Sequence, residues 1–150
     1  MPMPWAYRHA TKDWQAFLED AKAALDLTSD NMAYTAVQGV LLTFRRRLTP
    51  AQGLAFADQL PAVLRAIFVA GWDISQPPAP WADRETLTAE AQALRPHHNL
   101  TPPNAIAATA GALRAHVDQP AFDRMLGRLP PEAGAFWHVA EADRIARRIT

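Results

Sequence analysis

Residues 48–71 read LTPAQGLAFADQLPAVLRAIFVAG and contain the signals that begin and end two short helices. Thr49-Pro50 supplies an N-cap hydroxyl followed by a proline at the first helical position, and Gln52 can complete a capping box. Leu60-Pro61 ends this first helix, because proline disfavours the helical conformation in the residue before it. The second helix can then run from the proline to Gly71, which suits the C′ position.

Two longer helices are predicted before this stretch. Apolar residues recur at helical spacing within 11–26 and again within 30–48, which is the stripe of an amphipathic helix. Thr11 is available as the N-cap of the first helix, and Thr28-Ser29-Asp30 offers capping side chains for the second. Glycine is scarce and no strand-like alternation appears. The predicted fold class is therefore all-α, with about eight helices packed into one compact bundle.

Part of this pattern returns in the second half of the chain, where Leu60-Pro61 recurs as Leu129-Pro130. We call the spacing from Pro61 to Pro130 the repeat offset. It places Asp118, a good N-cap residue, at the position that corresponds to Thr49. Apolar character is kept at the pairs Leu18 and Leu87, Leu25 and Leu94, Val37 and Ile106, Phe44 and Leu113, and Phe68 and Trp137. This self-similarity predicts a tandem duplication of a four-helix unit, with each unit packed against its twin.

The predicted organisation is a single helical domain over residues 1–150. Its first repeat covers 11–71 and its second, degenerate repeat covers 84–149, with a last helix that extends to about Arg148. A proline-rich linker at 72–83 joins them, since closely spaced prolines favour an extended polyproline conformation and cannot continue a helix.

The run QLPAVLRAIFVAGW at 59–72 resembles the bacterial domain-of-unknown-function family numbered 2267. The opening WQAFLE at 14–19, ahead of a capped second helix, resembles the same family. The resemblance extends from about Trp14 to Trp137. It implies a small all-helical protein, and it brings no established activity or catalytic residue with it.

Composition argues against several classes of protein. The chain has no cysteine, so it has no disulfide framework, zinc ribbon, iron–sulfur cluster or thiol nucleophile. Its 15 basic and 15 acidic residues cancel, which disfavours a nucleic-acid binder that neutralises many phosphates. No signal peptide or long apolar run is apparent, so we expect a cytoplasmic protein with no membrane partner. Arginine far outnumbers lysine and alanine is abundant, which suggests a GC-rich bacterial genome.

Three histidines are candidate ligands or acid–base groups. His97 and His98 are adjacent on one loop, and neighbours of this kind rarely converge on one metal, so a solvated loop is the favoured interpretation. His138 and Glu141 lie at i and i+3 on the predicted last helix and supply less than half of a carboxylate-bridged metal site. We expect a surface pair there, and we expect no bound metal and no cofactor.

The run Arg45-Arg46-Arg47 closes the second long helix. Cations in a last turn interact favourably with the helix dipole and can bond its carbonyl oxygens. At about 100° per residue the three side chains fan around the helix, so Arg46 is expected to point outward. This structural role is preferred over a phosphate-binding or nucleic-acid-binding one.

Aromatic residues supply the candidate binding site. Phe68, Trp72 and Trp137 could line a cleft at the seam between the two repeats and take a hydrophobic ligand or a partner's helix; the alternative is that they pack in the core. No catalytic motif appears. The leading hypothesis is a non-enzymatic scaffold or protein-interaction module that binds another protein or a second copy of itself. A small hydrophobic-ligand binder comes second, and a metal-dependent enzyme third.

Overall fold

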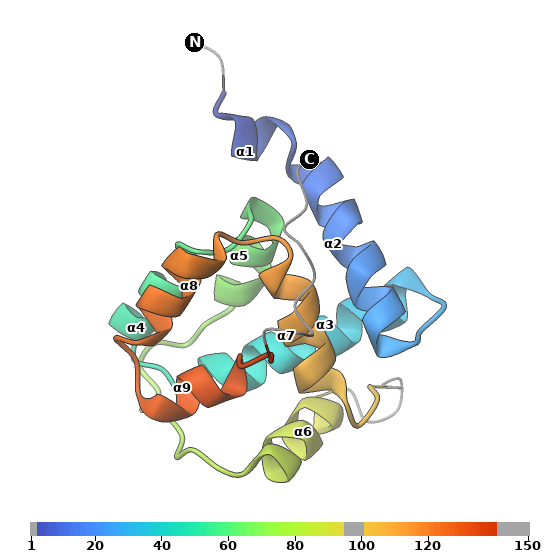
Figure 1. Cartoon of the computed structure of the whole chain (residues 1–150). Coiled ribbons are helices and arrows are strands. Elements are labelled where there is room, and N and C mark those ends of the chain that lie inside the picture. Colours follow the sequence, from blue (N-terminus) through green and yellow to red (C-terminus); the bar gives the residue numbers. More distant parts are fainter. Residues whose placement is uncertain (1–2, 95–100, 141–150) are drawn as a thin grey trace.

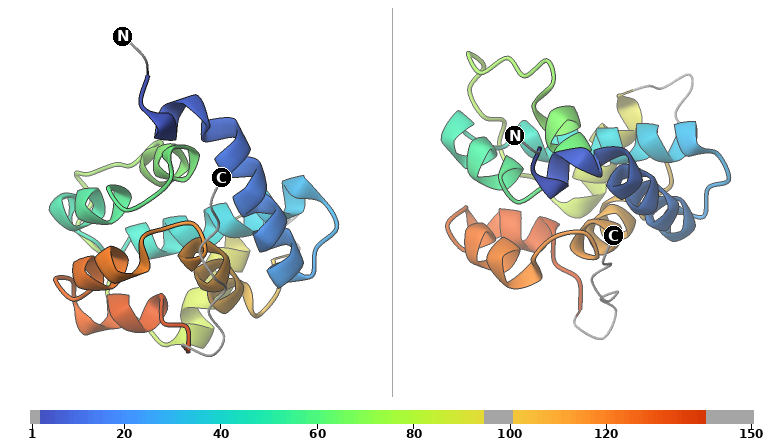
Figure 2. Two further views of the ribbon diagram at one scale, coloured as in Figure 1. Left: turned by 45° about the horizontal axis from the view of Figure 1, so that its top comes forward. Right: turned by 90° about the horizontal axis from the view of Figure 1, so that it is seen from above.

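Nine helices make up the part of the chain that the computed structural model describes, residues 3–94 and 101–140 (Figure 1). They are α1 (Trp5–Arg8), α2 (Ala10–Leu25), α3 (Asp30–Arg45), α4 (Pro50–Ala57), α5 (Ala62–Val69), α6 (Arg84–Ala93), α7 (Ala105–Arg114), α8 (Gln119–Leu126) and α9 (Pro131–Phe136). No strand occurs within these ranges, and the helices pack compactly (Figure 2). The predicted all-α class is confirmed.

The helix ends agree with most of the capping signals. Ser29 is the N-cap of α3, and its hydroxyl accepts the backbone N–H of Met32. The helix predicted over 11–26 is present as α2, but its predicted N-cap was wrong: the helix begins at Ala10, and Thr11 lies inside its first turn. Its N-cap is His9, which contributes no side-chain bond and directly follows the short helix α1. The sequence pattern did not predict α1.

The stretch that contains α4 and α5 folds as predicted. Thr49 and Gln52 form a complete capping box, with Pro50 at the first helical position. Pro61 precedes α5 as its N-cap. Gly71 follows the C-cap of α5 with a φ of 67°, the left-handed conformation that glycine adopts without strain.

The order of the four helices α2 to α5, the first set, is repeated by α6 to α9, the second set. The repeat offset relates α4 to α8 at both of their ends, and it relates the first residue of α5 to that of α9. Asp118 is the N-cap of α8, as predicted, and its carboxylate accepts the backbone N–H of Ala121. A common origin of the two sets by duplication stays a prediction.

The last helix is shorter than predicted. α9 ends at Phe136, and residues 137–140 are not helical. Trp137 leaves helical geometry with its carbonyl oxygen bonded to the side chain of Arg114, which stops the helix at this point. The remainder of the predicted helix, residues 141–150, lies outside the described residues.

The two sets of helices exchange packing partners. α2 packs mainly on α7 and α3 mainly on α6, so the first helix of each set rests on the second helix of the other; α4 also contacts α8 (Figure 1). An aromatic cluster fills the centre of the bundle. The centre of the Phe56 ring lies 4.8 Å from that of Phe44, 4.9 Å from that of Phe68 and 5.3 Å from that of Trp137. The hydrophobic core is therefore one body that both sets share.

We predict that Phe56→Ala lowers the free energy of unfolding by about 3–5 kcal/mol, because it removes a fully buried ring from the centre of this cluster. Urea denaturation measures the change. Leu54→Ala on the same helix is the matched control; its side chain is 61% exposed, and its effect should stay within about 0.5 kcal/mol. Equal losses for the two variants would contradict the placement of Phe56.

Candidate functional site

Arg45, at the end of α3, joins this helix to the end of α5. Its Nη1 donates to the carbonyl oxygens of Phe68 at 3.0 Å and of Ala70 at 2.9 Å. The guanidinium carbon lies 5.6 Å from the centre of the Trp72 ring, within the range of a cation–π contact. Burial lowers the pKa of Arg45, because desolvation disfavours the charged form.

Trp72 lies against α4 because residue 53 has no side chain. A Cβ atom on Gly53 would overlap the Trp72 ring. The ring also meets Phe68 edge-on, with the two ring centres 6.0 Å apart. The ring under the Arg45 guanidinium is thus positioned by α4 from one side and by α5 from the other.

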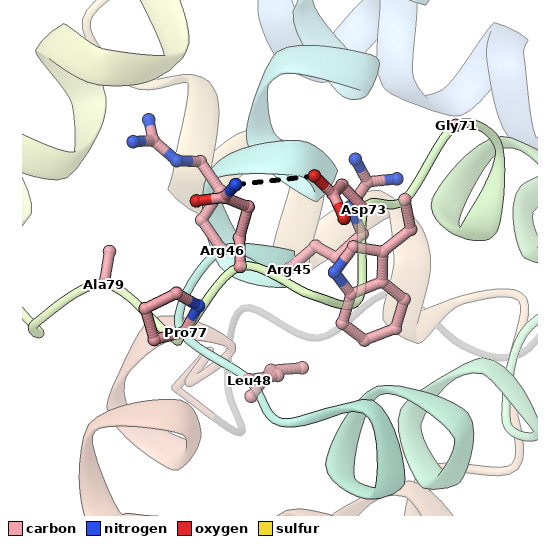
Figure 3. A pocket seen from close by; sticks show the side chains of 9 residues that line it. Arg45, Arg46, Leu48, Gly71, Asp73, Pro77 and Ala79 are labelled. Atoms are coloured by element: carbon pink, nitrogen blue, oxygen red, sulfur yellow. Dashed lines mark hydrogen bonds between the residues drawn. The ribbon is translucent and has the colours of Figure 1, made fainter.

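A surface pocket of about 260 Å³ opens beside these groups (Figure 3). Arg45, Arg46 and Trp72 line it together with Asp73 and Gln76 from the following loop. The Asp73 carboxylate accepts the hydroxyl of Ser75 and its backbone N–H, the latter at 3.0 Å, and these bonds lower the pKa of Asp73. The pocket therefore carries two guanidinium groups and one carboxylate at its wall.

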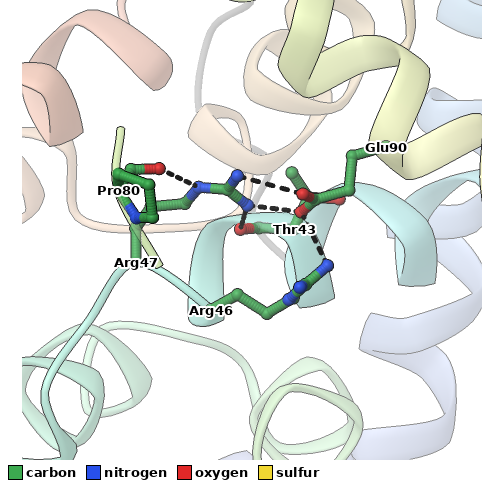
Figure 4. A network of polar contacts seen from close by, with 5 residues as sticks. All are labelled: Thr43, Arg46, Arg47, Pro80 and Glu90. Atoms are coloured by element: carbon green, nitrogen blue, oxygen red, sulfur yellow. Dashed lines mark hydrogen bonds and ion pairs between the residues drawn. The ribbon is translucent and has the colours of Figure 1, made fainter. Parts of the chain in front are cut away.

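Arg47 is the centre of a polar network that joins α3, the linker and α6 (Figure 4). Its side chain is only 5% exposed. Its Nε donates to the carbonyl oxygen of Pro80 at 3.2 Å, and its Nη1 donates to that of Thr43 at 2.9 Å. Both terminal nitrogens bond the Glu90 carboxylate, with Nη2 at 3.0 Å from Oε1. Arg46 points outward, as predicted, and reaches the same carboxylate at 3.3 Å.

A second buried polar pair, His116 and Asp20, lies just beyond the end of α7. His116 Nε2 lies 2.7 Å from Asp20 Oδ2, and the two side chains are 5% and 11% exposed. The repeat offset relates His116 to Arg47. In both sets of helices, therefore, the side chain that follows the second helix pairs with a carboxylate on the first helix of the other set.

Arg114 is a buried charge that the sequence analysis did not identify. Its side chain is 2% exposed, its Nε donates to the carbonyl oxygen of Trp137 at 2.8 Å, and its Nη2 lies 2.9 Å from Asp123 Oδ1. The guanidinium carbon is 5.2 Å from the centre of the Phe122 ring. Its Nη1 is buried without a hydrogen-bond partner.

Arg114 repeats the role of Arg45, and the repeat offset between them was the signal that could have found it. Each guanidinium bonds the carbonyl at the end of the fourth helix of its set and lies over an aromatic ring. In the first set the ring is Trp72, which packs against Gly53. In the second set it is Phe122, which occupies the position that corresponds to that glycine.

The three aromatic residues predicted to bind a ligand lie in two different environments. Phe68 and Trp137 have no exposed surface and pack in the central aromatic cluster. Trp72 is partly buried and lines the pocket beside Arg45. Side chains thus fill the space around two of the three, and a ligand-binding role for the set stays a prediction.

Only one of the candidate histidine ligands belongs to the described residues. His138 is exposed at the rim of another pocket, while His97, His98 and Glu141 lie outside those residues. In the part of the chain that the structure describes, no group of three or more His, Asp or Glu side chains is placed to hold a metal ion. None of the helices in that part is long and apolar enough to cross a membrane.

These observations define a class: an all-helical protein in which two four-helix sets exchange packing partners and buried arginines join the helix ends. The chain belongs to the DUF2267 family of uncharacterized conserved proteins, whose family model matches residues 14–136. This confirms the resemblance seen in the sequence. No curated protein matches the chain.

We predict that Glu90→Gln lowers the free energy of unfolding by about 3 kcal/mol, because it leaves the buried Arg47 guanidinium without a counter-charge. Glu85→Gln, at an exposed position on the same helix, is the control and should have little effect. Thermal and urea denaturation measure both. Wild-type stability of the Glu90→Gln variant would contradict the structural role assigned to this network.

We further predict that Gly53→Ala lowers the free energy of unfolding by about 1–3 kcal/mol, because the new Cβ displaces the Trp72 ring. Tryptophan emission should shift to longer wavelength as the indole enters water. Gly111→Ala is the matched control, since a Cβ at Gly111 meets open space and alanine favours a helix. Wild-type stability together with an unchanged emission maximum for Gly53→Ala would contradict this placement of Trp72.

Proposed function

We propose that the protein is a non-enzymatic helical interaction module that associates with a second copy of itself. Its N-terminal arm, residues 3–8, is the observation that carries this proposal. The arm includes α1, which buries no residue and projects from one end of the bundle (Figure 1). Trp5 is 60% exposed, Tyr7 51% and Met3 56%.

The chemistry of the arm supports a role in protein association. Aromatic residues and methionine are enriched at protein interfaces, and an aromatic side chain buries a large apolar area while fixing only two torsion angles. Large apolar side chains clustered on an exposed segment usually mark an interaction site. The arm places three of them at alternate positions of one short segment.

The balanced charge supports a protein partner, and a second copy in particular. The formal net charge of zero gives little self-repulsion between copies. The same balance offers no excess of basic residues for a phosphate backbone. Three buried basic side chains are already paired with carboxylates within the bundle, in the pairs Arg47–Glu90, His116–Asp20 and Arg114–Asp123.

Native mass spectrometry and sedimentation over a concentration series test this proposal on the full chain. We expect dimers of the wild-type protein, and we expect Trp5→Ala/Tyr7→Ala to raise the dissociation constant at least about tenfold, because exposed aromatic anchors dominate interface energies. Leu54→Ala/Ile74→Ala is the control, since both side chains are similarly exposed but lie outside the arm. A wild-type chain that stays monomeric, or a double variant that associates equally well, would refute the proposal.

A small-molecule binder is the second candidate, and one observation favours it. A pocket of about 240 Å³ between α6 and α9 is lined by Leu87, Ile106 and Phe136, with Trp81 of the linker beside it. The lining is mainly apolar, as expected of a site for a hydrophobic ligand. The same native mass spectra separate the two candidates: a monomer that retains the mass of a small apolar compound would support the binder instead.

A further inference from the structure

Arg65, on α5, bonds backbone carbonyl oxygens at the end of the neighbouring helix α4. Its Nε donates to the carbonyl oxygen of Ala57 at 3.1 Å, and its Nη2 donates to that of Leu60 at 3.3 Å. The last carbonyls of a helix lack partners within the helix, and the helix dipole makes this end attractive to a cation. In the first set of helices, a guanidinium group thus occupies a site formed by carbonyl oxygens at the α4–α5 junction.

The second set repeats the junction without the arginine. α8 and α9 correspond to α4 and α5, so Leu126 corresponds to Ala57 and Leu129 to Leu60. Gly134 stands where Arg65 would be expected. Leu126, Leu129 and Gly134 all line one surface pocket of about 340 Å³. The positions whose carbonyl oxygens hold Arg65 in the first set therefore have counterparts beside this pocket, while the side chain that would fill the space is missing.

This pocket contains one acceptor that the first set lacks. Asp123 lines the pocket at the position that corresponds to Leu54, so the second set has a carboxylate where the first has a hydrocarbon. Arg114 and His138 also line the pocket; Arg114 Nη2 lies 2.9 Å from Asp123 Oδ1, so these two charges offset each other. The first set holds the Arg65 guanidinium although its corresponding position, Leu54, has no carboxylate. We therefore expect the second set to bind a guanidinium at least as tightly.

One observation argues for an anion in this pocket and against a cation. The buried Nη1 of Arg114 has no hydrogen-bond partner, which by itself would favour an anion. An anion in this pocket, however, would face the Asp123 carboxylate and the carbonyl oxygens at the end of α8, all of which are negative or partly negative. A planar cation with several N–H donors matches these acceptors, as Arg65 does in the first set.

We propose that the α8–α9 pocket binds a guanidinium group in the place that Arg65 fills in the first set of helices. The group comes from a ligand outside the chain. The site is independent of self-association through the N-terminal arm, and either proposal can fail without the other.

Ethylguanidinium is the probe, with ethylammonium and acetate as controls, in titrations of the full chain followed by calorimetry and by the amide NMR signals of Gly127 and Gly134. We expect saturable binding of ethylguanidinium at roughly millimolar concentration, which is normal for so small a ligand, and at least tenfold weaker binding of ethylammonium. Binding of acetate in place of ethylguanidinium, or equal binding of the two cations, would overturn the proposal.

Gly134→Arg tests the location of the site. A Cβ at Gly134 meets open space, so the new side chain can enter the pocket and bond the carbonyl oxygens itself. We expect it to weaken ethylguanidinium binding at least tenfold and to raise the melting temperature by several degrees. Gly134→Ala is the matched control: it adds helix propensity without filling the pocket, and it should keep the affinity. Unchanged affinity in Gly134→Arg would contradict the assignment.

One further variant completes the test. Arg65→Gly opens the matching space in the first set, so the melting temperature of this variant should fall. Ethylguanidinium should restore part of the loss, and no restoration would contradict the correspondence between the two junctions on which the proposal rests.

Discussion

A guanidinium at the end of the second helix of each set, partly buried in Arg45 and fully buried in Arg114, determines where the following helices lie. Arg45 closes α3 and Arg114 closes α7, and each bonds the carbonyl at the end of the fourth helix of its set. A charge taken out of water is costly unless it is paired and hydrogen-bonded, so the partner carbonyl must stay within reach. The rings under the two guanidinium groups, Trp72 and Phe122, share this constraint. The aromatic cluster, the pocket beside Trp72 and the α8–α9 pocket are arranged around these two anchors.

The exchanged packing makes the two sets of helices interdependent. α2 rests on α7 and α3 rests on α6, and a polar pair reinforces each crossing: His116 with Asp20, and Arg47 with Glu90. Each half of the chain therefore supplies the counter-charge and the apolar face that the other half requires. This also explains why sets so similar in order can differ in detail, since each needs only to remain complementary to the other.

Local signals in the sequence were enough to predict much of the fold. The capping box at Thr49, the left-handed Gly71 and the N-cap Asp118 were all correct, because each depends on a few neighbouring residues. The error at the last helix arose where a distant residue decides. α9 stops at Phe136 because Arg114, far away in the sequence, bonds the carbonyl of Trp137. The candidate site was harder still, since an aromatic stripe does not distinguish a cleft from a filled core: Phe68 and Trp137 are fully buried, and only the fold shows this.

The exchange of partners between the two sets also has a consequence during synthesis. α2 ends at Leu25, whereas α7, on which it packs, begins at Ala105. At about 5–20 residues per second, a ribosome needs on the order of 4–16 s to make the residues between them. Throughout this interval α2 lacks its main partner, and its apolar face can pack only on α3 and α5. The nascent chain must therefore hold an unfinished core until its second half emerges, and interruption of translation near the linker would release a chain with half of its interior exposed to other proteins.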